Sequence, residues 1–177
     1  LFGLYQPDTG SIKIRGETVH IDNPNIANEL GIGMVHQHFK LVHNFTVTEN
    51  IVLGMEPHSG LVLSLAAASQ RVKALSEQYG LNVDPDARIE DISVGMQQRV
   101  EILKMLYRNA EVLIFDAPTA VLTPQEIQDL MKIMRNLLGE GKSIVLITHK
   151  LKEIKAIADR CTVIRRGKTI GTVDVKD

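Results

Sequence analysis

The sequence predicts an α/β fold with a mostly parallel sheet, an antiparallel β hairpin and an inserted α-helical subdomain. Three observations lead to this prediction. Apolar runs of strand length occur at residues 31–35, 112–115 and 143–147, and such runs are typical of strands buried on both faces of a parallel sheet. Stretches with helical spacing alternate with these runs, as in a sheet with crossover helices. A longer block, residues 38–106, has mostly helical patterning and separates the first two runs.

Length and composition fit one domain with a core of its own. The chain has 177 residues and a formal net charge of -1, so no overall basic surface favours nucleic-acid binding. The single cysteine, Cys161, argues against a disulfide framework and a cysteine-based zinc site, and it fits a reducing, cytosolic setting. No apolar run has the length of a membrane span, so we expect any membrane role to come through a partner.

The first part of the chain contains a predicted turn and a predicted hairpin. Residues 1–4 have the pattern of the last turn of an apolar helix, and residues 6–10 have strong turn chemistry. Because such a helix needs preceding turns, we expect the sequence to be truncated before Leu1. Alternating apolar and polar residues then predict paired strands over 11–15 and 18–21.

Capping residues and stop signals position the predicted helices. Asn23 precedes a proline, Thr46 and Thr123 each precede a glutamate by three residues, and Gly80 follows a long amphipathic stretch. Residues 57–60 break the helical pattern. These signals predict helices over 24–30, 47–53, 64–79, 94–107, 124–138 and 151–158, and a final pair of strands over 160–165 and 168–173.

The strand over 112–115 runs directly into Asp116, a single carboxylate at its carboxyl end. Ligands of open α/β sheets bind outside this edge, and Mg²⁺ on a nucleotide prefers one or two carboxylates beside phosphate oxygens and water. Asp116 is therefore a candidate magnesium ligand. The alternative is a core strand that ends in a helix-capping aspartate. Ala117 stands where a catalytic acid would be most useful, and it carries no reactive group.

Other polar residues also follow a predicted strand or open a predicted helix. Gln37 and His149 each follow a predicted parallel strand. Ser93 and Gly95 open the helix over 94–107, where free N–H groups and the helix dipole attract a phosphate. Taken alone, a residue such as Gln37 is more often a polar loop residue, and one such as His149 is more often an ordinary surface histidine. Ser93 is also expected to be the N-cap of its helix, which is compatible with phosphate binding.

In this order, the motifs resemble the nucleotide-binding domain of ATP-binding cassette (ABC) transporters, and the resemblance covers essentially the whole chain. It implies a P-loop NTPase-like (RecA-like) fold. Residues 1–37 and 107–177 would form the α/β core, and residues 38–106 the helical subdomain. The matching segments are Gln37 for the Q-loop, 93–97 for the signature motif, 114–116 for the end of the Walker B strand, 120–123 for the D-loop and His149 for the switch histidine.

The resemblance also implies a role for each site residue. ATP and Mg²⁺ would be the cofactors, with Asp116 and Gln37 as the magnesium site. His149 and Gln37 would be the catalytic residues, and His149 would contact the γ-phosphate. The signature motif would act on ATP held by a second domain, so the site would be complete only in a dimer. The nucleotide-binding residues implied in this way are Gln37, Ser93, Gly95, Gln97 and His149.

The sequence departs from the family in two places. The phosphate-binding P-loop, G-x-x-x-x-G-K-[ST], has no match in the chain. Residues 136–143 and 162–169 come near it, but neither lies between a strand and a helix as a P-loop must. Ala117 stands where the family has the glutamate that polarises the attacking water, and general-base catalysis contributes roughly 10²–10⁴-fold.

The residues within two motifs make the resemblance more specific to one group of the family. SVGMQQRVEI over 93–102 and TVTENIVLG over 46–54 look most like importers for simple sugars and nucleosides, in which two such domains are often fused in one chain. The implied partners are transmembrane permease subunits and a second ABC domain, as a dimer or a fused tandem, with no nucleic acid. The implied location is the cytoplasmic face of the cell membrane, as a peripheral subunit.

We therefore expect an ATP-binding and ATP-hydrolysing importer subunit, impaired in this chain by the lack of a P-loop and by Ala117. A catalytically degenerate domain with a structural or regulatory role is the main alternative. A soluble ABC ATPase of DNA repair or translation is disfavoured, because the helical insertion is short and Cys161 stands alone. A zinc site at His36, His38 and His43 lacks any recognised ligand spacing.

Overall fold

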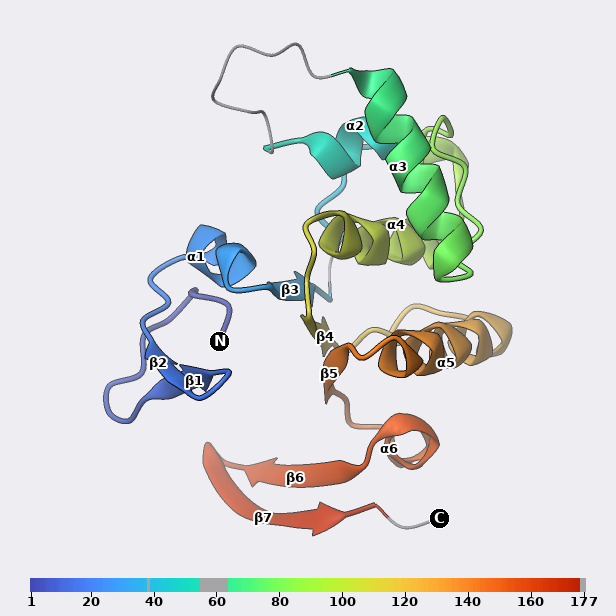
Figure 1. Cartoon of the computed structure of the whole chain (residues 1–177). Helices are drawn as coiled ribbons and strands as arrows, with labels where there is room; N and C mark the ends of the chain where they lie inside the picture. The colour runs from blue at the N-terminus through green and yellow to red at the C-terminus, as the bar shows by residue number, and fades with distance from the viewer. Residues whose placement is uncertain (38, 55–63, 176–177) are drawn as a thin grey trace.

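The computed structural model describes residues 1–37, 39–54 and 64–175 (Figure 1). His38 and the break predicted over 57–60 lie outside these residues. The strands are β1 (Ile12–Ile14), β2 (Glu17–Val19), β3 (Ile32–Val35), β4 (Val112–Asp116), β5 (Ser143–Ile147), β6 (Arg160–Arg165) and β7 (Lys168–Asp174). The helices are α1 (Pro24–Glu29), α2 (Val47–Val52), α3 (Leu65–Gln78), α4 (Val94–Tyr107), α5 (Pro124–Gly139) and α6 (Leu151–Ile157), with a 3₁₀ turn at Ile89–Asp91.

A parallel sheet of three strands, in the order β3-β4-β5, positions the predicted site. Val35 of β3 pairs with Phe115 of β4, and Asp116 pairs with Ile147 of β5. The three apolar runs predicted as parallel strands are therefore confirmed as one sheet, and β3 and β4 are largely buried as expected. The prediction that the third run is buried is wrong, because β5 is the last strand of this sheet and its residues Val145 and Ile147 are 40% and 50% exposed. Because the strands run the same way and start in register, their carboxyl ends share one edge.

Two antiparallel hairpins accompany this sheet, β1-β2 and β6-β7. The hairpin expected near the N-terminus is confirmed, and the last two predicted strands pair as a second hairpin. Both have a two-residue turn with positive φ at each position, 51° and 86° at Arg15 and Gly16, and 50° and 73° at Arg166 and Gly167. Such turns match the right-handed twist of the strands that they connect.

The helix end expected over residues 1–4 is wrong. The structure has no helix in the first ten residues, which form bends and irregular chain. Gly3 has a φ of 78° and its Cα faces the backbone of Asn23, where an added Cβ would come within 2.5 Å. Four apolar residues make no helical hydrogen bond on their own, so the left-handed glycine and the contact with Asn23 determine the conformation.

The predicted caps are present in the structure. The Asn23 side chain accepts hydrogen bonds from the backbone N–H groups of Asn25 and Ile26, the second and third residues of α1. Thr46 and Thr123 each form a capping box with a glutamate three residues later, at the starts of α2 and α5. Ser93 caps α4 by accepting from the Met96 N–H. These local signals explain why the helix starts could be predicted within about one residue.

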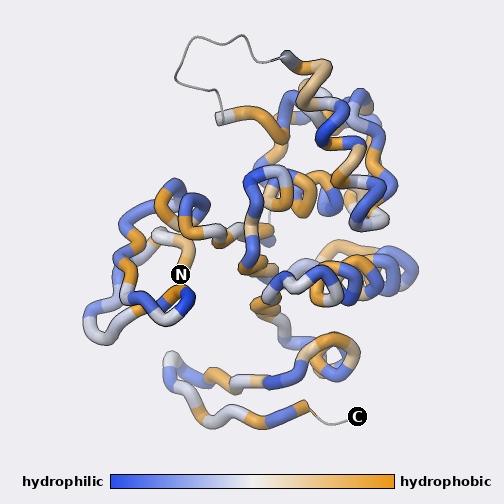
Figure 2. The backbone as a smooth tube through the Cα atoms, viewed as in Figure 1, coloured by the Kyte–Doolittle hydropathy of each residue, from blue (hydrophilic) through white to orange (hydrophobic). Residues whose placement is uncertain are grey.

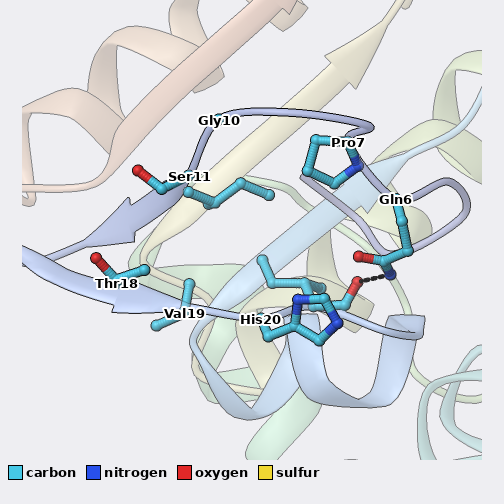
Figure 3. A pocket seen from close by; sticks show the side chains of 9 residues that line it. Gln6, Pro7, Gly10, Ser11, Thr18, Val19 and His20 are labelled. Carbon is cyan, nitrogen blue, oxygen red and sulfur yellow. Dashed lines mark hydrogen bonds between the residues drawn. The ribbon is translucent and has the colours of Figure 1, made fainter.

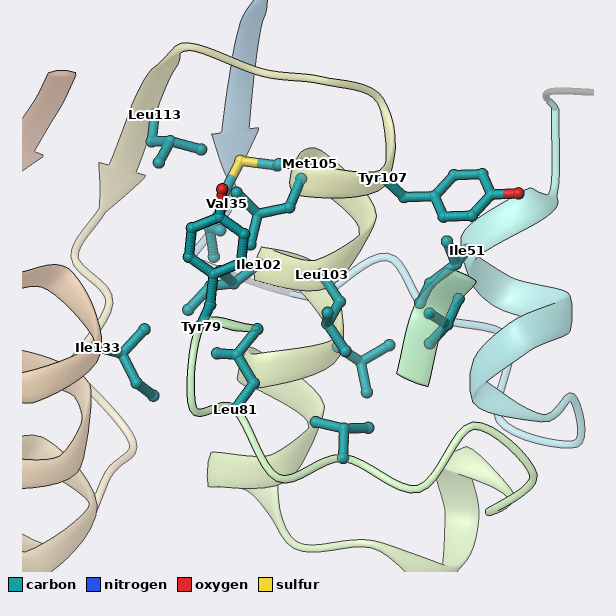
Figure 4. Packing of buried hydrophobic residues seen from close by; sticks show 14 of the residues in the cluster. Val35, Ile51, Tyr79, Leu81, Ile102, Leu103, Met105, Tyr107, Leu113 and Ile133 are labelled. Carbon is teal, nitrogen blue, oxygen red and sulfur yellow. The ribbon is translucent and has the colours of Figure 1, made fainter. Parts of the chain in front are cut away.

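Helix α4 lies between the parallel sheet and the helices α2 and α3, and it contributes six buried residues to the shared core (Figure 4). Ile102 and Leu103 are fully buried, and Met105 packs on β3 so closely that a Cβ on Gly33 would lie 2.8 Å from its side chain. A glycine at position 33 therefore permits this approach. Helix α5 alternates hydrophobic and hydrophilic residues along its turns, as a helix with one buried face does (Figure 2).

Within the described residues, no helix combines the length and the apolar character needed to cross a membrane.

Candidate functional site

The carboxyl edge of β3-β4-β5 brings together three of the residues singled out in the sequence. Asp116 is the last residue of β4, while Gln37 and His149 each follow the last residue of a neighbouring strand by two positions. Adjacent strands lie about 4.8 Å apart, so the ends of β3 and β5 are separated by roughly 10 Å, with β4 between them. Gln37 and His149 are exposed, and Asp116 is half-buried. This spacing suits a ligand that lies across the edge of the sheet.

Ala117 has an unusual backbone conformation for a residue with a side chain. Its φ is 45°, in the left-handed region, and its N–H donates to the Ile147 carbonyl at 2.9 Å. This hydrogen bond extends the β4-β5 pairing by one residue past Asp116. Left-handed non-glycine residues carry strain of roughly 1–3 kcal/mol and cluster at functional sites. The chain therefore turns sharply, and under strain, immediately after the candidate magnesium ligand.

Two side chains of helix α4 that the sequence analysis missed hydrogen-bond to the loops that follow β3 and β4. Gln98 is buried, and its amide donates to the Pro118 carbonyl at 2.7 Å. Glu101 is also buried and accepts from the Lys40 N–H at 2.9 Å. Polar residues at i and i+3 on an otherwise apolar helix face are a sequence signal for such contacts.

The N-terminus of α4 contacts α5 instead of the sheet edge. Ser93 donates to the Glu126 carboxylate at 3.4 Å, and the Gly95 N–H also interacts with this carboxylate. The pKa of Glu126 is lowered, chiefly because the Thr123 backbone N–H and hydroxyl donate to it, with smaller contributions from Gly95 and Ser93. The helix end predicted to attract a phosphate thus interacts with an anionic oxygen of its own chain.

Gln97 is placed differently from the other sequence candidates. Its side-chain amide donates to the carbonyls of Ile89 and Ile92, each at 3.3 Å. These bonds hold the 3₁₀ turn against the start of α4, where Ser93 and Gly95 lie. The contacts of Gln97 therefore join the 3₁₀ turn to the start of α4 and do not reach the sheet edge.

The donor set at the sheet edge fits Mg²⁺. Asp116 supplies a carboxylate and Gln37 a side-chain amide oxygen, and both are oxygen ligands of the kind that Mg²⁺ accepts beside phosphates and water. Across the part of the chain that the structure describes, no group of at least three histidine, cysteine, aspartate or glutamate residues could hold a metal. His36 packs edge-on against Phe2, and burial, then the nearby Lys40, lowers its pKa.

A surface hollow of about 690 Å³ adjoins the candidate site. It lies along β5 and β6 and includes Thr148, the residue before His149. Another hollow, of about 210 Å³, lies under the hairpin β1-β2, where the Gln6 amide donates to the Ile21 carbonyl at 2.6 Å (Figure 3). This second hollow shares no lining residue with the sheet edge.

Comparison with known proteins places this geometry in a family. Residues 1–120 match the model of the family described as ABC transporter. The chain is 63% identical over 177 residues to the nucleoside import ATP-binding protein NupA of Lactococcus lactis subsp. cremoris, and 64% identical to the guanosine import ATP-binding protein NupO of Bacillus subtilis. Each alignment covers 100% of this chain and 35% of the relative. The chain thus spans about a third of the length of these curated relatives.

Solved structures agree on the fold. A nucleotide-free ATP-binding cassette from an ABC transporter superposes with a TM-score of 0.79 at 20% identity, over 99% of this chain and 73% of that one. The cassette MJ1267 of another ABC transporter gives 0.82 at 20% identity, over 98% and 73%. The P-loop NTPase-like fold predicted from the motifs is therefore confirmed. The match to the family model over residues 1–120, more than half of the chain, shows that the chain belongs to the ABC transporter family.

Proposed function

We propose that the chain is part of the ATP-binding subunit of an importer, and that the edge formed by Gln37, Asp116 and His149 is its Mg²⁺–ATP site. The observation that carries the proposal is the convergence of these side chains at the carboxyl ends of three adjacent parallel strands. Ligands of open α/β sheets bind at this edge. The match to the ABC transporter model supports the same assignment.

Each residue has a physical role in this proposal. Asp116 and Gln37 hold Mg²⁺ through oxygen atoms, and the ion would neutralise charge on the ATP phosphates. His149 donates a hydrogen bond to the terminal phosphate from the end of β5. In this chain the Ser93 hydroxyl and the Gly95 N–H contact the Glu126 carboxylate, and a phosphate oxygen of ATP held by a second domain would take the place of that carboxylate.

The D-loop segment, residues 120–123, would contact that second domain in this proposal. Ala120 and Val121 lie between Asp116 and helix α5 and are exposed, Val121 by 61%. This exposure leaves the segment accessible to a second domain. We propose a second ABC domain, separate or fused, and permease subunits as the partners, with the assembly on the cytoplasmic face of the membrane.

The identities favour nucleosides over simple sugars as the imported substrates. Two relatives named for nucleoside or guanosine import are 63% and 64% identical to the chain. Relatives named for carbohydrate, glucose or ribose import are 46%, 43% and 41% identical. The transported molecule itself would be selected by partners that the chain does not contain.

A second candidate function rests on Ala117. A methyl group cannot accept a proton from water, so a site with Ala117 would bind ATP and hydrolyse it slowly. The chain would then act as a regulatory or structural nucleotide-binding domain. Because the 177 residues contain no G-x-x-x-x-G-K-[ST] match, we also expect the isolated chain to bind ATP weakly.

A chimera tests the proposed function. The 177 residues replace the matching residues of the Lactococcus lactis relative, which aligns with the whole chain. Uptake of labelled guanosine and ribose is then measured in membrane vesicles that contain the permease subunits of that relative. We expect ATP-dependent guanosine uptake that falls at least tenfold in Asp116→Asn. Equal uptake by the unsubstituted chimera and by Asp116→Asn would reject the assignment of the sheet edge.

A further inference from the structure

We infer that Glu153 is a positioning residue. Its buried carboxylate binds both the turn that contains His149 and the loop after Asp116, and we call this connection the clasp. This inference rests on the proposed function, since it assigns His149 to the site. Glu153 lies in α6, and only 4% of it is exposed. A buried carboxylate is expensive unless charged or hydrogen-bonding groups surround it, so its partners define what it does.

The partners of Glu153 come from both sides of the sheet edge. Thr148, which directly precedes His149, donates its hydroxyl to one carboxylate oxygen at 2.7 Å. Thr119, three residues after Asp116, donates its hydroxyl to the other. Thr119 is itself only 3% exposed, so this contact is shielded from water. One side chain of α6 therefore joins the segment after β5 to the segment after β4.

Lys150, which directly follows His149, completes the cluster. Its ammonium lies 3.6 Å from the Glu153 carboxylate and donates to the Thr119 carbonyl at 3.1 Å and hydroxyl at 3.0 Å. The Lys150 N–H donates to the Thr148 hydroxyl at 3.1 Å. Both neighbours of His149 are thus fixed, while His149 itself remains exposed.

In this arrangement, the residues that hold the turn are different from the residue that would contact the ligand. The exposed His149 ring can contact a ligand outside the sheet edge. The clasp holds Thr148 and Lys150, the neighbours of His149, and so determines the position of the ring before a ligand binds. Because Thr119 shares the clasp, a shift of the loop after Asp116 would move the His149 turn with it. A hydrogen-bonded network in a low-dielectric interior transmits such a shift more firmly than exposed polar contacts would.

Hydrogen exchange on the chimera tests the clasp without relying on ATP turnover. In Glu153→Gln we expect the backbone amides of residues 117, 119 and 120 and of residues 148–150 to exchange faster together, by at least tenfold. Thr119→Val, which removes one hydroxyl at nearly constant volume, should loosen both segments in the same way. Asp129→Asn serves as the control, because its ion pair with Arg99 joins α5 to α4. Exchange that rises in only one segment, or in neither, would overturn the clasp.

Kinetics tests whether the clasp acts through His149. In the chimera we expect Glu153→Gln to lower kcat of ATP turnover about tenfold with little change in KM. In a His149→Ala background, the same substitution should lower kcat no further, since positioning matters only when the ring is present. Additive losses would overturn the positioning role. A chimera with no turnover at all would count against the proposed function, and the exchange result would still decide the clasp.

Discussion

Restoring a carboxylate at position 117 should convert a slow site into a fast one. The structure fixes this position by the Ala117 N–H bond to the Ile147 carbonyl, one residue past the candidate magnesium ligand Asp116. Ala117 is half-buried, so a longer side chain can extend toward solvent. A general base contributes roughly 10²–10⁴-fold, which corresponds to about 3–5 kcal/mol of transition-state stabilisation at 1.36 kcal/mol per decade.

The stability of the fold should change little in this experiment. The left-handed φ of 45° at Ala117 strains any residue that has a Cβ, so alanine and glutamate share the same strain. We expect Ala117→Glu to alter the free energy of unfolding by less than about 0.5 kcal/mol, as for other surface substitutions. A thermal melt of both chimeras checks this before any rate is compared.

Single-turnover hydrolysis of radiolabelled ATP by the chimera is the assay. Ala117→Gln is the matched control, because its amide can hydrogen-bond a water molecule but cannot take its proton at neutral pH. We expect Ala117→Glu to raise the rate at least 100-fold over Ala117, and Ala117→Gln to stay within about tenfold of it. Equal rates for Ala117 and Ala117→Glu would show that another group supplies the base and would refute the reasoning.

Three further predictions follow from single contacts. Gln98→Leu leaves the buried Pro118 carbonyl without its donor, so a urea titration should show a loss of about 1–3 kcal/mol; an unchanged midpoint would contradict this contact. Burial lowers the pKa of His36, so below about pH 6.5 the unfolded chain binds more protons than the folded chain. The free energy of unfolding should therefore fall as the pH is lowered through that range, and it should fall less in His36→Gln. The pKa of Glu126 is lower in the folded chain than in the unfolded chain, so its ionised carboxylate stabilises the fold at a pH above the unfolded-state pKa. This stabilisation should disappear as the pH falls through the folded-state pKa, and melting temperatures that stay constant over that acid range would exclude it.

The sequence predicted the elements of the site better than the contacts between them. The run before Asp116 and the capping box at Thr123 are local signals, and the strand and helix that they predict are present. The shared edge of Gln37, Asp116 and His149 followed from parallel pairing, which the apolar runs indicated. In each of these cases a short stretch of chain contains the information.

Long-range polar contacts could not be predicted from local patterns. The clasp at Glu153 joins residues 34 positions apart, and the bond from the Lys40 N–H to Glu101 joins residues 61 positions apart. A glutamate on a short helix has the same local pattern whether it is solvated or buried, so only packing distinguishes the two. The error over residues 1–4 has a similar origin, because the contact of Gly3 with Asn23 outweighs apolar periodicity.

Binding of Mn²⁺, as a spectroscopic substitute for Mg²⁺, tests the central claim most directly. Electron paramagnetic resonance would measure free Mn²⁺ in titrations of the chimera with ATP present, for the unsubstituted protein and for Asp116→Asn, with Asp129→Asn as a control outside the sheet edge. We expect ATP-dependent Mn²⁺ binding that weakens at least tenfold in Asp116→Asn and not in Asp129→Asn. Equal Mn²⁺ affinity in all three proteins would contradict the assignment of the β3-β4-β5 edge as the metal–nucleotide site.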